Sequence, residues 1–388
     1  MLQTSLLSIV IPTLNRYDTL IPLIRALCSF ESQKLEVIVH DNSIDNETFL
    51  RFYNLLKDSR IKYFHVEGTL SAIENCNLAV SKATGRYVCF IGDDDGVSEQ
   101  IISCCEWMSE IGVESVIFNR AIYTWPGTEH YFKLNNKSNG KLIVPPYSGQ
   151  IQKLSIAEQY KKIVRSGGQS MFHAPRLYHG IISKESLDQL YANYRTYFPG
   201  PVPDMSNCIA LSKYVKSHFF IDLPIVITGQ SSKSMSGKNA NRKHQGEIKK
   251  ETSLPAETSA NWDRRIPFYW SGPTIWAQAL VEASTRIGYS FTSKNFNYAN
   301  LYAYCLAFTS QKYYPRVFKV IFDEFKFFDR LKIIFSVIFY LMKISLIRLR
   351  ILTVKFFGSN EASSYDDIET VIGYINTSLS NKSLFEKN

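Results

Sequence analysis

The first 120 residues alternate short apolar runs, rich in β-branched side chains, with stretches of helical periodicity. Near-continuous apolar strands separated by helices are typical of a mostly parallel sheet that is covered on both faces. We therefore predict an α/β fold of the doubly wound, Rossmann-like kind, with helices flanking the sheet. The predicted strands are "LLSIVIP" (6–12), "LEVIVH" (35–40), "IKYFHV" (61–66), "RYVCFIG" (86–92) and "VESVIFN" (113–119).

Polar side chains follow three of these strands. In open sheets of this class, ligands bind beyond the carboxyl ends of the strands. That edge would present Asn15 and Arg16, then Asp41 and Asn42, then residues 93–95. The sequence has neither G-x-G-x-x-G after the first strand nor G-x-x-x-x-G-K-[ST], so the usual glycine-rich phosphate loops are missing. If a nucleotide binds here, carboxylates and a metal must supply many of the contacts that hold it.

Three adjacent carboxylates, Asp93, Asp94 and Asp95, follow the fourth predicted strand. Their mutual repulsion and their oxygen ligands suit a hard divalent cation such as Mg²⁺ or Mn²⁺, and a bound diphosphate would complete the charge balance. A solvated acidic turn is the alternative. An EF-hand is excluded, because Ile91 and Ile102 would occupy the first and twelfth loop positions.

The overall charge points to anionic partners. The chain has 44 Lys and Arg against 35 Asp and Glu, a net charge of +9, which suits phosphates, nucleic acid or an acidic membrane surface. The aromatic residues lie mainly in apolar runs rather than between arginines, so we predict no nucleic-acid partner.

The seven cysteines form no C-x-x-C pair and are predicted to be reduced, as in a cytoplasm. The N-terminal apolar run lacks a basic region and a cleavage site and is predicted to be a strand, not a signal peptide.

Four segments of the chain carry a resemblance to a known family: "SIVIPTLNR" (8–16), "EVIVHDNSIDN" (36–46), "ENCNLAVSKATGRYVCFIGDDDG" (74–96) and, more loosely, "PIVITGQSSKSMSG" (224–237). With these segments the chain resembles the glycosyltransferases of family 2, which have the GT-A fold. The resemblance is firm over the first third of the chain, follows order and spacing in the middle third, and hardly extends to the last third.

The resemblance implies a nucleoside-diphosphate sugar donor, with UDP as the expected nucleotide, and a divalent metal, Mn²⁺ or Mg²⁺. It implies that Thr13 contacts the nucleotide, that Asp41 bonds to the pyrimidine base and that Asp93 lies near the ribose. Asp94 would ligate the metal and Asp95 would assist. The chain departs from the common pattern at His40, where many members have aspartate, and at Cys76, where many have an arginine.

The acceptor side offers one candidate base and two histidines. By order along the chain, Asp204 in "PGPVPDMSN" matches the family's catalytic base, which takes the proton of the acceptor hydroxyl. Capping of the helix that follows is the alternative role for Asp204. His173 and His179 are candidates for a metal or phosphate contact, against the commoner role of structural histidines.

We predict three regions: 1–120, the nucleotide-sugar-binding half; 121–260, the acceptor-binding half with a basic loop at 229–251; and 261–388, a helical C-terminal region. Within the last, 330–357 is apolar and basic but has no uncharged run long enough for a bilayer span, which favours a helix lying on a membrane surface. A buried helix or a dimer interface is the alternative. The tail from residue 359 is expected to be polar and mobile.

Together these features predict an inverting glycosyltransferase of bacterial surface-polysaccharide (O-antigen or capsule) assembly. It would act on a lipid-linked or glycan acceptor, as a peripheral protein on the cytoplasmic face of the plasma membrane. Two alternatives stay open: a non-catalytic scaffold that binds nucleotide sugar or membrane, and a sugar-1-phosphate nucleotidyltransferase. The second is disfavoured, because "IPTLNRYD" is not the basic glycine-rich loop expected of such enzymes.

Overall fold

A computed structural model of the chain describes residues 5–68, 70–128, 140–233, 245–251, 254–289, 295–357 and 364–380; for 348–357 it describes the backbone only. Much of the basic loop, 234–244, and the side chains of Arg348, Arg350 and Lys355 therefore lie outside the described residues.

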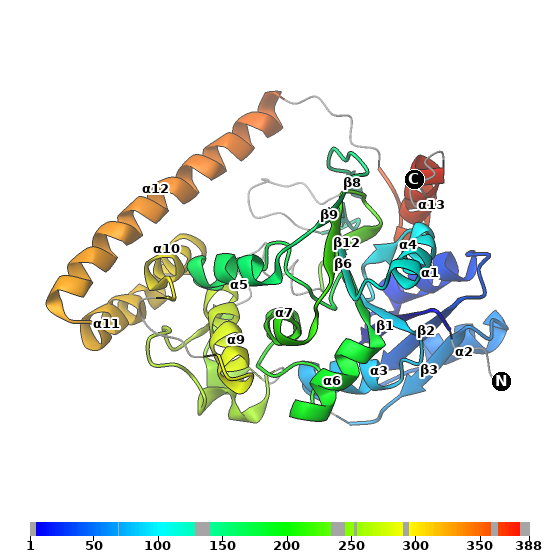
Figure 1. The fold of residues 1–388 in the computed structure, drawn as a ribbon, viewed down its shortest axis with the longest axis horizontal. Helices are drawn as coiled ribbons and strands as arrows, with labels where there is room; N and C mark the ends of the chain where they lie inside the picture. Colours follow the sequence, from blue (N-terminus) through cyan, green and yellow to red (C-terminus); the bar gives the residue numbers. More distant parts are fainter. Residues whose placement is uncertain are drawn as a thin grey trace.

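An eight-stranded sheet forms the centre of the molecule (Figure 1). Its order is β3-β2-β1-β4-β10-β6-β11-β9. The four N-terminal strands run parallel, while β10 is antiparallel to both of its neighbours and β9 is antiparallel to β11. The strands are β1 (Leu7–Thr13), β2 (Leu35–Asp41), β3 (Ile61–His65), β4 (Tyr87–Phe90), β6 (Ser115–Phe118), β9 (Ile151–Lys153), β10 (Gly180–Ser183) and β11 (His218–Ile221).

A smaller sheet of order β5-β12-β7-β8 lies beside the end of β4 and brings a distant segment to the acidic residues. Its strand β12 runs parallel to β7 and antiparallel to β5, which directly follows the three aspartates. A third pair joins β13 and β14. These strands are β5 (Gly96–Val97), β7 (Ala121–Thr124), β8 (Lys141–Ile143), β12 (Val226–Gln230), β13 (Gln245–Gly246) and β14 (Trp270–Ser271).

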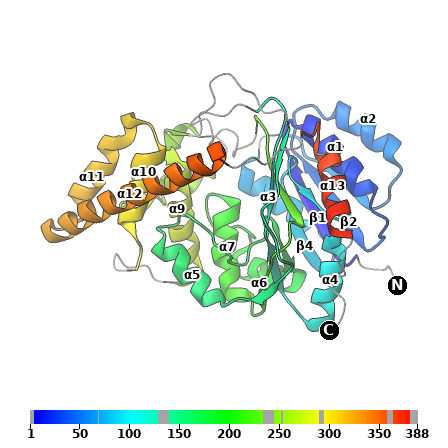
Figure 2. The same cartoon turned by 90° about the horizontal axis from the view of Figure 1, so that it is seen from above.

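Helices cover both faces of the large sheet, with α1, α4 and α13 on one side and α3, α6 and α7 on the other (Figure 2). Beyond α7, helices α9 to α12 extend away from the sheet. The helices are α1 (Tyr17–Cys28), α2 (Glu47–Leu56), α3 (Ala72–Ser81), α4 (Gln100–Ile111), α5 (Ile156–Arg165), α6 (Lys184–Tyr194), α7 (Pro203–Tyr214), α9 (Gly272–Arg286), α10 (Tyr298–Phe308), α11 (Tyr314–Glu324), α12 (Phe327–Phe357) and α13 (Ile368–Ser380).

The two-residue period of β1 shows how the sheet separates two cores. Leu7, Ile9 and Ile11 join the core under α1, α4 and α13, whereas Val10 joins the core under α3, α7 and α9. Both faces are therefore apolar, as a sheet covered on two sides requires. Helix α3 begins with the capping box that "SAIE" suggests, in which Ser71 and Glu74 bond each other's backbone.

The five predicted strands are all present, and each observed end lies within two residues of the predicted one. The segment 330–357 is helical, as predicted, and belongs to α12. Within the described residues, none of the helices has both the length and the apolar composition needed to cross a bilayer.

The prediction of a mobile tail is wrong for residues 368–380. There α13 buries one apolar face in the core beside α1, and Ile368 and Ile372 lie against Gly96. The buried positions repeat every three or four residues, as in an amphipathic helix; they are Ile368, Val371, Ile372, Ile375 and Leu379.

Candidate active site

The first of the three aspartates, Asp93, is held by the turn that follows β1. Thr13 Oγ1 donates a 2.6 Å hydrogen bond to Asp93 Oδ2. The guanidinium of Arg16 pairs with the other oxygen, with 2.8 Å between Nη2 and Oδ1. Burial, the dominant cause, raises the pKa of Asp93 to about 7 despite the attraction of Arg16. In the ligand-free protein this carboxyl therefore titrates near neutral pH instead of in the usual acidic range.

Asp94 is the least firmly paired of the three carboxylates. Its Oδ2 accepts hydrogen bonds from Ser231, at 3.1 Å from the backbone nitrogen and 2.7 Å from Oγ. Its Oδ1 lies 3.6 Å from Arg16 Nη1, which is an ion pair without close contact. Burial and then repulsion by Asp95 raise the pKa of Asp94. A bound cation would offset both the cost of burying the charge and the repulsion by Asp95, and would thus favour the ionised form of Asp94.

Asp95 accepts four hydrogen bonds. Backbone N–H groups of Gly92 and Gly229 each lie at 2.7 Å, the Tyr178 hydroxyl at 3.0 Å and His179 Nε2 at 2.7 Å. Burial alone would raise the pKa of Asp95, but the interaction with His179 and these hydrogen bonds lower it. Asp95 is thus the ionised, structurally fixed member of the group.

The tautomer of His179 follows from its second neighbour. Arg120 Nη1 lies 2.8 Å from His179 Nδ1 and can only donate, so Nδ1 accepts and Nε2 donates to Asp95. Burial lowers the pKa of His179, in keeping with a neutral ring. A chain of hydrogen bonds thus joins Arg120 to Asp95.

Two glycines let the surrounding backbone reach the carboxylates. A Cβ on Gly229 would lie 1.7 Å from the carbonyl oxygen of Asp94, which no rearrangement of side chains could relieve. A Cβ on Gly92 would lie 3.0 Å from Asp95 Oδ2. The close approach of β12 to the aspartates therefore requires glycine at position 229.

Asp41 lies on the neighbouring strand end, since Thr13 and Asp41 are partners in the β1–β2 register. Its carboxylate is fully buried and accepts hydrogen bonds from Tyr17 Oη (2.6 Å), Tyr63 Oη (2.8 Å) and the backbone N–H of Ser43 (2.8 Å). Burial and the bond to Asp41 raise the pKa of both tyrosines, which keeps them protonated as donors.

Asp204 is the second residue of α7 and is partly buried. Val202 occupies the N-cap position, so Asp204 is not the N-cap, although its Oδ1 accepts a 2.8 Å bond from Met205 N. Burial raises the pKa of Asp204 against the attraction of Arg176 and Arg120. Arg120 also interacts with Asp95, so one guanidinium lies within electrostatic range of both acids.

Comparison with protein families decides what kind of domain holds this arrangement. Residues 8–174 match the model of the Glycosyl transferase family 2, a range that includes Thr13, Asp41 and all three aspartates. Residues 8–174 thus resemble a family 2 glycosyltransferase domain.

Curated relatives of the chain are named as glycosyltransferases. "Glycosyltransferase GlyG" of Streptococcus pneumoniae is 28% identical over 132 residues, 34% of this chain and 44% of that protein. An Escherichia coli protein named UDP-Glc:alpha-D-GlcNAc-diphosphoundecaprenol beta-1,3-glucosyltransferase WfaP is 32% identical over 122 residues, covering 30% and 46%. The Campylobacter jejuni protein named GalNAc(5)-diNAcBac-PP-undecaprenol beta-1,3-glucosyltransferase is 31% identical over 115 residues, covering 29% and 37%.

The chain thus spans less than half the length of each of these relatives. All three are named as glycosyltransferases, which confirms the predicted class of enzyme for the family 2 domain.

Among solved structures, S. aureus TarS 1–349 in complex with UDP-GlcNAc superimposes with a TM-score of 0.50 at 12% identity, over 82% of this chain and 80% of that one. This likeness, together with the family match, confirms the predicted GT-A fold.

The structure brings most of the predicted site residues of the family 2 domain together. Thr13 bonds directly to Asp93, the first of the three aspartates, and Asp41 is the partner of Thr13 in the β1–β2 register. Arg120 interacts electrostatically with both Asp95 and Asp204, which links Asp204 to the aspartates. His179 contacts Asp95, whereas the ring of His173 packs against Phe220, with centroids 4.5 Å apart, and is no part of the site. The roles assigned to these residues stay predictions.

Several residues of the site are not predicted from the sequence. The sequence predicts Arg16 at the edge of the sheet but not its pairing with two aspartates. The partners Tyr17, Tyr63, Arg120 and Ser231 come from separate segments, and no sequence pattern linked them to the carboxylates.

The raised pKa of Asp93 predicts how the stability of the ligand-free protein depends on pH. Its folded pKa of about 7 exceeds the unfolded value of about 3.9, so the folded state binds the proton more tightly. The resulting stabilisation is complete below the unfolded pKa and is lost as pH rises through the folded pKa. Between pH 5 and pH 8 we expect Asp93 to remove roughly 2–3 kcal/mol of unfolding free energy.

The measurement is urea unfolding of the natural protein and of Asp93→Asn at both pH values. The substitution removes the titrating group, so the free energy of the variant should fall less between pH 5 and pH 8. Equal losses in the two proteins would contradict the assignment.

Proposed function

We propose that the protein is an inverting, metal-dependent glycosyltransferase that moves a sugar from a UDP-sugar to a lipid-linked acceptor. The main support is one arrangement: three buried aspartates at the end of β4, beside Thr13 and Asp41, within a family 2 domain. We keep the three proposed regions 1–120, 121–260 and 261–388, noting that α13 of the third packs on the first.

The donor set at the aspartates fits a metal that the donor itself helps to bind. Among the described residues, no group of three or more His, Cys, Asp and Glu side chains could hold a metal ion alone. Mg²⁺ and Mn²⁺ in phosphate sites are often held by one or two carboxylates plus phosphate oxygens. We assign Asp94 to this role because, among the described residues, Arg16 at 3.6 Å is the one partner of its Oδ1. When bound, the metal neutralises the diphosphate leaving group.

Arg16 is the cation that balances Asp93 and Asp94 in the ligand-free protein. A guanidinium binds phosphate as readily as carboxylate, so we expect Arg16 to turn toward the diphosphate when the donor arrives. This would supply the phosphate contact that the family pattern places at position 76, where this chain has cysteine.

Asp41 is proposed to accept a hydrogen bond from the N–H of the uracil ring. Because its carboxylate is fully buried between the Tyr17 and Tyr63 hydroxyls, the base can reach it only by displacing one of them. Tyr17 and Tyr63 are both partly exposed, so exposure allows the displacement of either hydroxyl. Thr13 and Asp93, bonded to each other, would then adjoin the ribose.

Asp204 is proposed as the general base. Inversion requires that the acceptor oxygen attack the anomeric carbon from the face opposite the diphosphate while its proton passes to a carboxylate. The C–O bond to the diphosphate breaks as the new C–O bond forms, and the proton remains on Asp204. The raised pKa of Asp204 makes it a stronger base than an exposed aspartate.

The acceptor is proposed to be a lipid-diphosphate-linked sugar of bacterial surface-polysaccharide assembly. The support is that the Escherichia coli and Campylobacter jejuni relatives carry undecaprenol-linked acceptors in their names. A peripheral position on the inner face of the plasma membrane would follow from such an acceptor.

Helix α12 offers a surface for that membrane. Phe328, Phe335 and Phe339 are 76%, 70% and 63% exposed and lie on one face of the helix, because they are seven and four residues apart. The opposite face packs on α10 through Val337 and Ile344. Lys332 and Lys343 add positive charge that suits anionic lipid headgroups.

We expect Phe335→Glu combined with Phe339→Glu to reduce sedimentation with anionic lipid vesicles about tenfold or more, since two charges would enter the interface. Leu55→Glu on α2, which replaces an 80% exposed leucine elsewhere, is the control and should leave binding intact. Equal binding of both variants, or a change of molar mass in light scattering instead, would favour the alternative of a dimer interface.

The function itself is tested by a screen of UDP-sugars for diphosphate release, with a lipid-diphosphate-linked acceptor, in Mn²⁺ and in chelator. Metal-dependent turnover supports the proposal. Binding of nucleotide sugar without turnover would indicate a scaffold, and formation of nucleotide sugar from a sugar phosphate would indicate a nucleotidyltransferase.

A further inference from the structure

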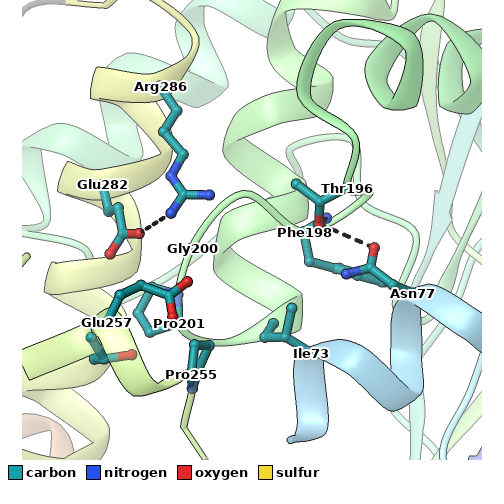
Figure 3. Close-up of a pocket in the computed structure, with 11 residues that line it drawn as sticks. Ile73, Asn77, Thr196, Phe198, Gly200, Pro201, Pro255, Glu257, Glu282 and Arg286 are labelled. Atoms are coloured by element: carbon teal, nitrogen blue, oxygen red, sulfur yellow. Dashed lines mark hydrogen bonds and ion pairs between the residues drawn. The ribbon is translucent and has the colours of Figure 1, made fainter.

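A cavity of about 180 Å³ lies between α3, the loop before α7 and α9 (Figure 3). It is separate from the three aspartates and contains no residue used above. Residues that define it include Ile73, Asn77, Phe198, Glu257, Glu282 and Arg286.

The cavity is close to the proposed base. Ile73, Cys76 and Asn77 are three and four residues apart and share one face of α3. Cys76 lies near enough to Asp204 for that charge to add to the effect of burial, which raises the pKa of the thiol to about 12. Pro201, another lining residue, comes three residues before Asp204. The same face of α3 thus adjoins both Asp204 and the cavity.

One side of the cavity is apolar and the other is hydrogen-bonding. Ile73 and Phe198 form part of the apolar side. On the other side, Arg286 Nη2 pairs with Glu282 Oε1 at 2.8 Å. Glu257 has no ion-pair or side-chain hydrogen-bond partner in the described part of the chain, and its carboxylate points into the cavity (Figure 3). The charges of Glu257 and Glu282 are near enough to repel each other.

Asn77 supplies a donor. Its Oδ1 accepts from Thr196 Oγ1 at 3.1 Å and from Tyr197 N at 2.8 Å, which fixes the amide and directs Nδ2 to the cavity (Figure 3). The lining therefore offers carboxylate acceptors, an amide donor and a guanidinium.

This combination of carboxylates, amide, guanidinium and apolar surface suits a neutral ring that carries several hydroxyl groups. Carboxylates accept from sugar hydroxyls, the amide and guanidinium donate to sugar oxygens, and the apolar wall suits the C–H face of a ring. A phosphate is disfavoured, because two carboxylates face one guanidinium. The volume is on the scale of one sugar ring.

We propose that this cavity binds the sugar residue of the acceptor, with Glu257 and Asn77 as the residues that recognise it. The inference rests on the proposed transferase function and adds the location and the chemical class of the acceptor subsite.

The test uses a short-chain lipid diphosphate carrying one N-acetylglucosamine as the acceptor probe. In Glu257→Gln and Asn77→Ala the KM for this probe should rise about tenfold or more, as expected for loss of a hydrogen bond to a charged group or from the partly buried amide of Asn77. The KM for the donor and the kcat should change little. Glu110→Gln, an exposed acid on α4, is the matched control.

A direct binding measurement separates this inference from the function. Saturation-transfer NMR should detect contact between the sugar protons of the probe and the natural protein without any donor, with loss of the signal in Glu257→Gln and no competition from inorganic diphosphate. Binding of the probe without any sugar transfer would support the proposed acceptor subsite and contradict the proposed transferase function. Turnover with an unchanged probe KM in both variants, or displacement by diphosphate, would overturn the subsite.

Discussion

Asp94→Asn is expected to lower metal-dependent transfer by about a thousandfold or more, because the metal would lose the proposed protein ligand that holds it against the leaving diphosphate. Asparagine keeps the size of the side chain and an oxygen that can accept the hydrogen bonds of Ser231. The fold should therefore survive, so the loss can be assigned to charge. The measurement is the rate of diphosphate release at saturating Mn²⁺.

Binding supplies the second readout for Asp94. In the natural protein, Mn²⁺ with UDP should raise the unfolding temperature, and in Asp94→Asn this rise should disappear. Asp323→Asn, a change of the same kind at an exposed position on α11, should behave like the natural protein. Full activity in Asp94→Asn would refute the metal role and, with it, the central argument for the site.

Asp204→Asn is expected to reduce sugar transfer by about a hundredfold to ten-thousandfold, the range for loss of a general base. The asparagine oxygen can still accept from Met205 N, so the start of α7 should be preserved. Unlike Asp94→Asn, this variant should retain the stabilisation by Mn²⁺ and UDP, because Asp204 does not touch the proposed nucleotide site. Loss of activity together with loss of nucleotide binding would indicate a structural role instead.

The raised pKa of Asp204 adds a pH signature to this second prediction. A base acts only when deprotonated, so kcat should fall as pH decreases through its pKa, and the residual activity of Asp204→Asn should lack that decline. A shared decline in both proteins would assign the titration to another group, such as Asp93.

The sequence was sufficient for the sheet and for the acidic cluster because both are local signals. A buried parallel strand is recognisable from its own residues, and three adjacent carboxylates after one strand need no knowledge of the rest of the chain. The edge at which the ligand should bind then follows from the direction of parallel strands.

The surroundings of the carboxylates could not be predicted in the same way. Gly229 and Ser231 reach them because β12 pairs with β5, and Arg120 and His179 meet only after β6 and β10 have joined the sheet. These contacts depend on how distant segments pair, which periodicity does not encode. The positive φ of His179, +63°, is a further local feature without a sequence signal, since the residue is not glycine.

Helix α13 differs from these contacts, because its own residues carry the pattern from which it could be predicted. The apolar residues of "IETVIGYINTSLS" recur at the spacing of an amphipathic helix, yet the polar segment before it suggested a tail. The 13 residues of α13 are amphipathic when considered apart from the polar residues that flank them.

The position of α12 bears on how the protein would meet a lipid surface. Helix α12 packs on α10, on the side of the sheet opposite to α13, which packs on α1 (Figure 2). The contact with α10 holds α12 to the body of the protein. The exposed phenylalanines of α12 should therefore keep a constant direction relative to the three aspartates. A bilayer bound to these phenylalanines would then hold the aspartates at a constant height and orientation above its surface.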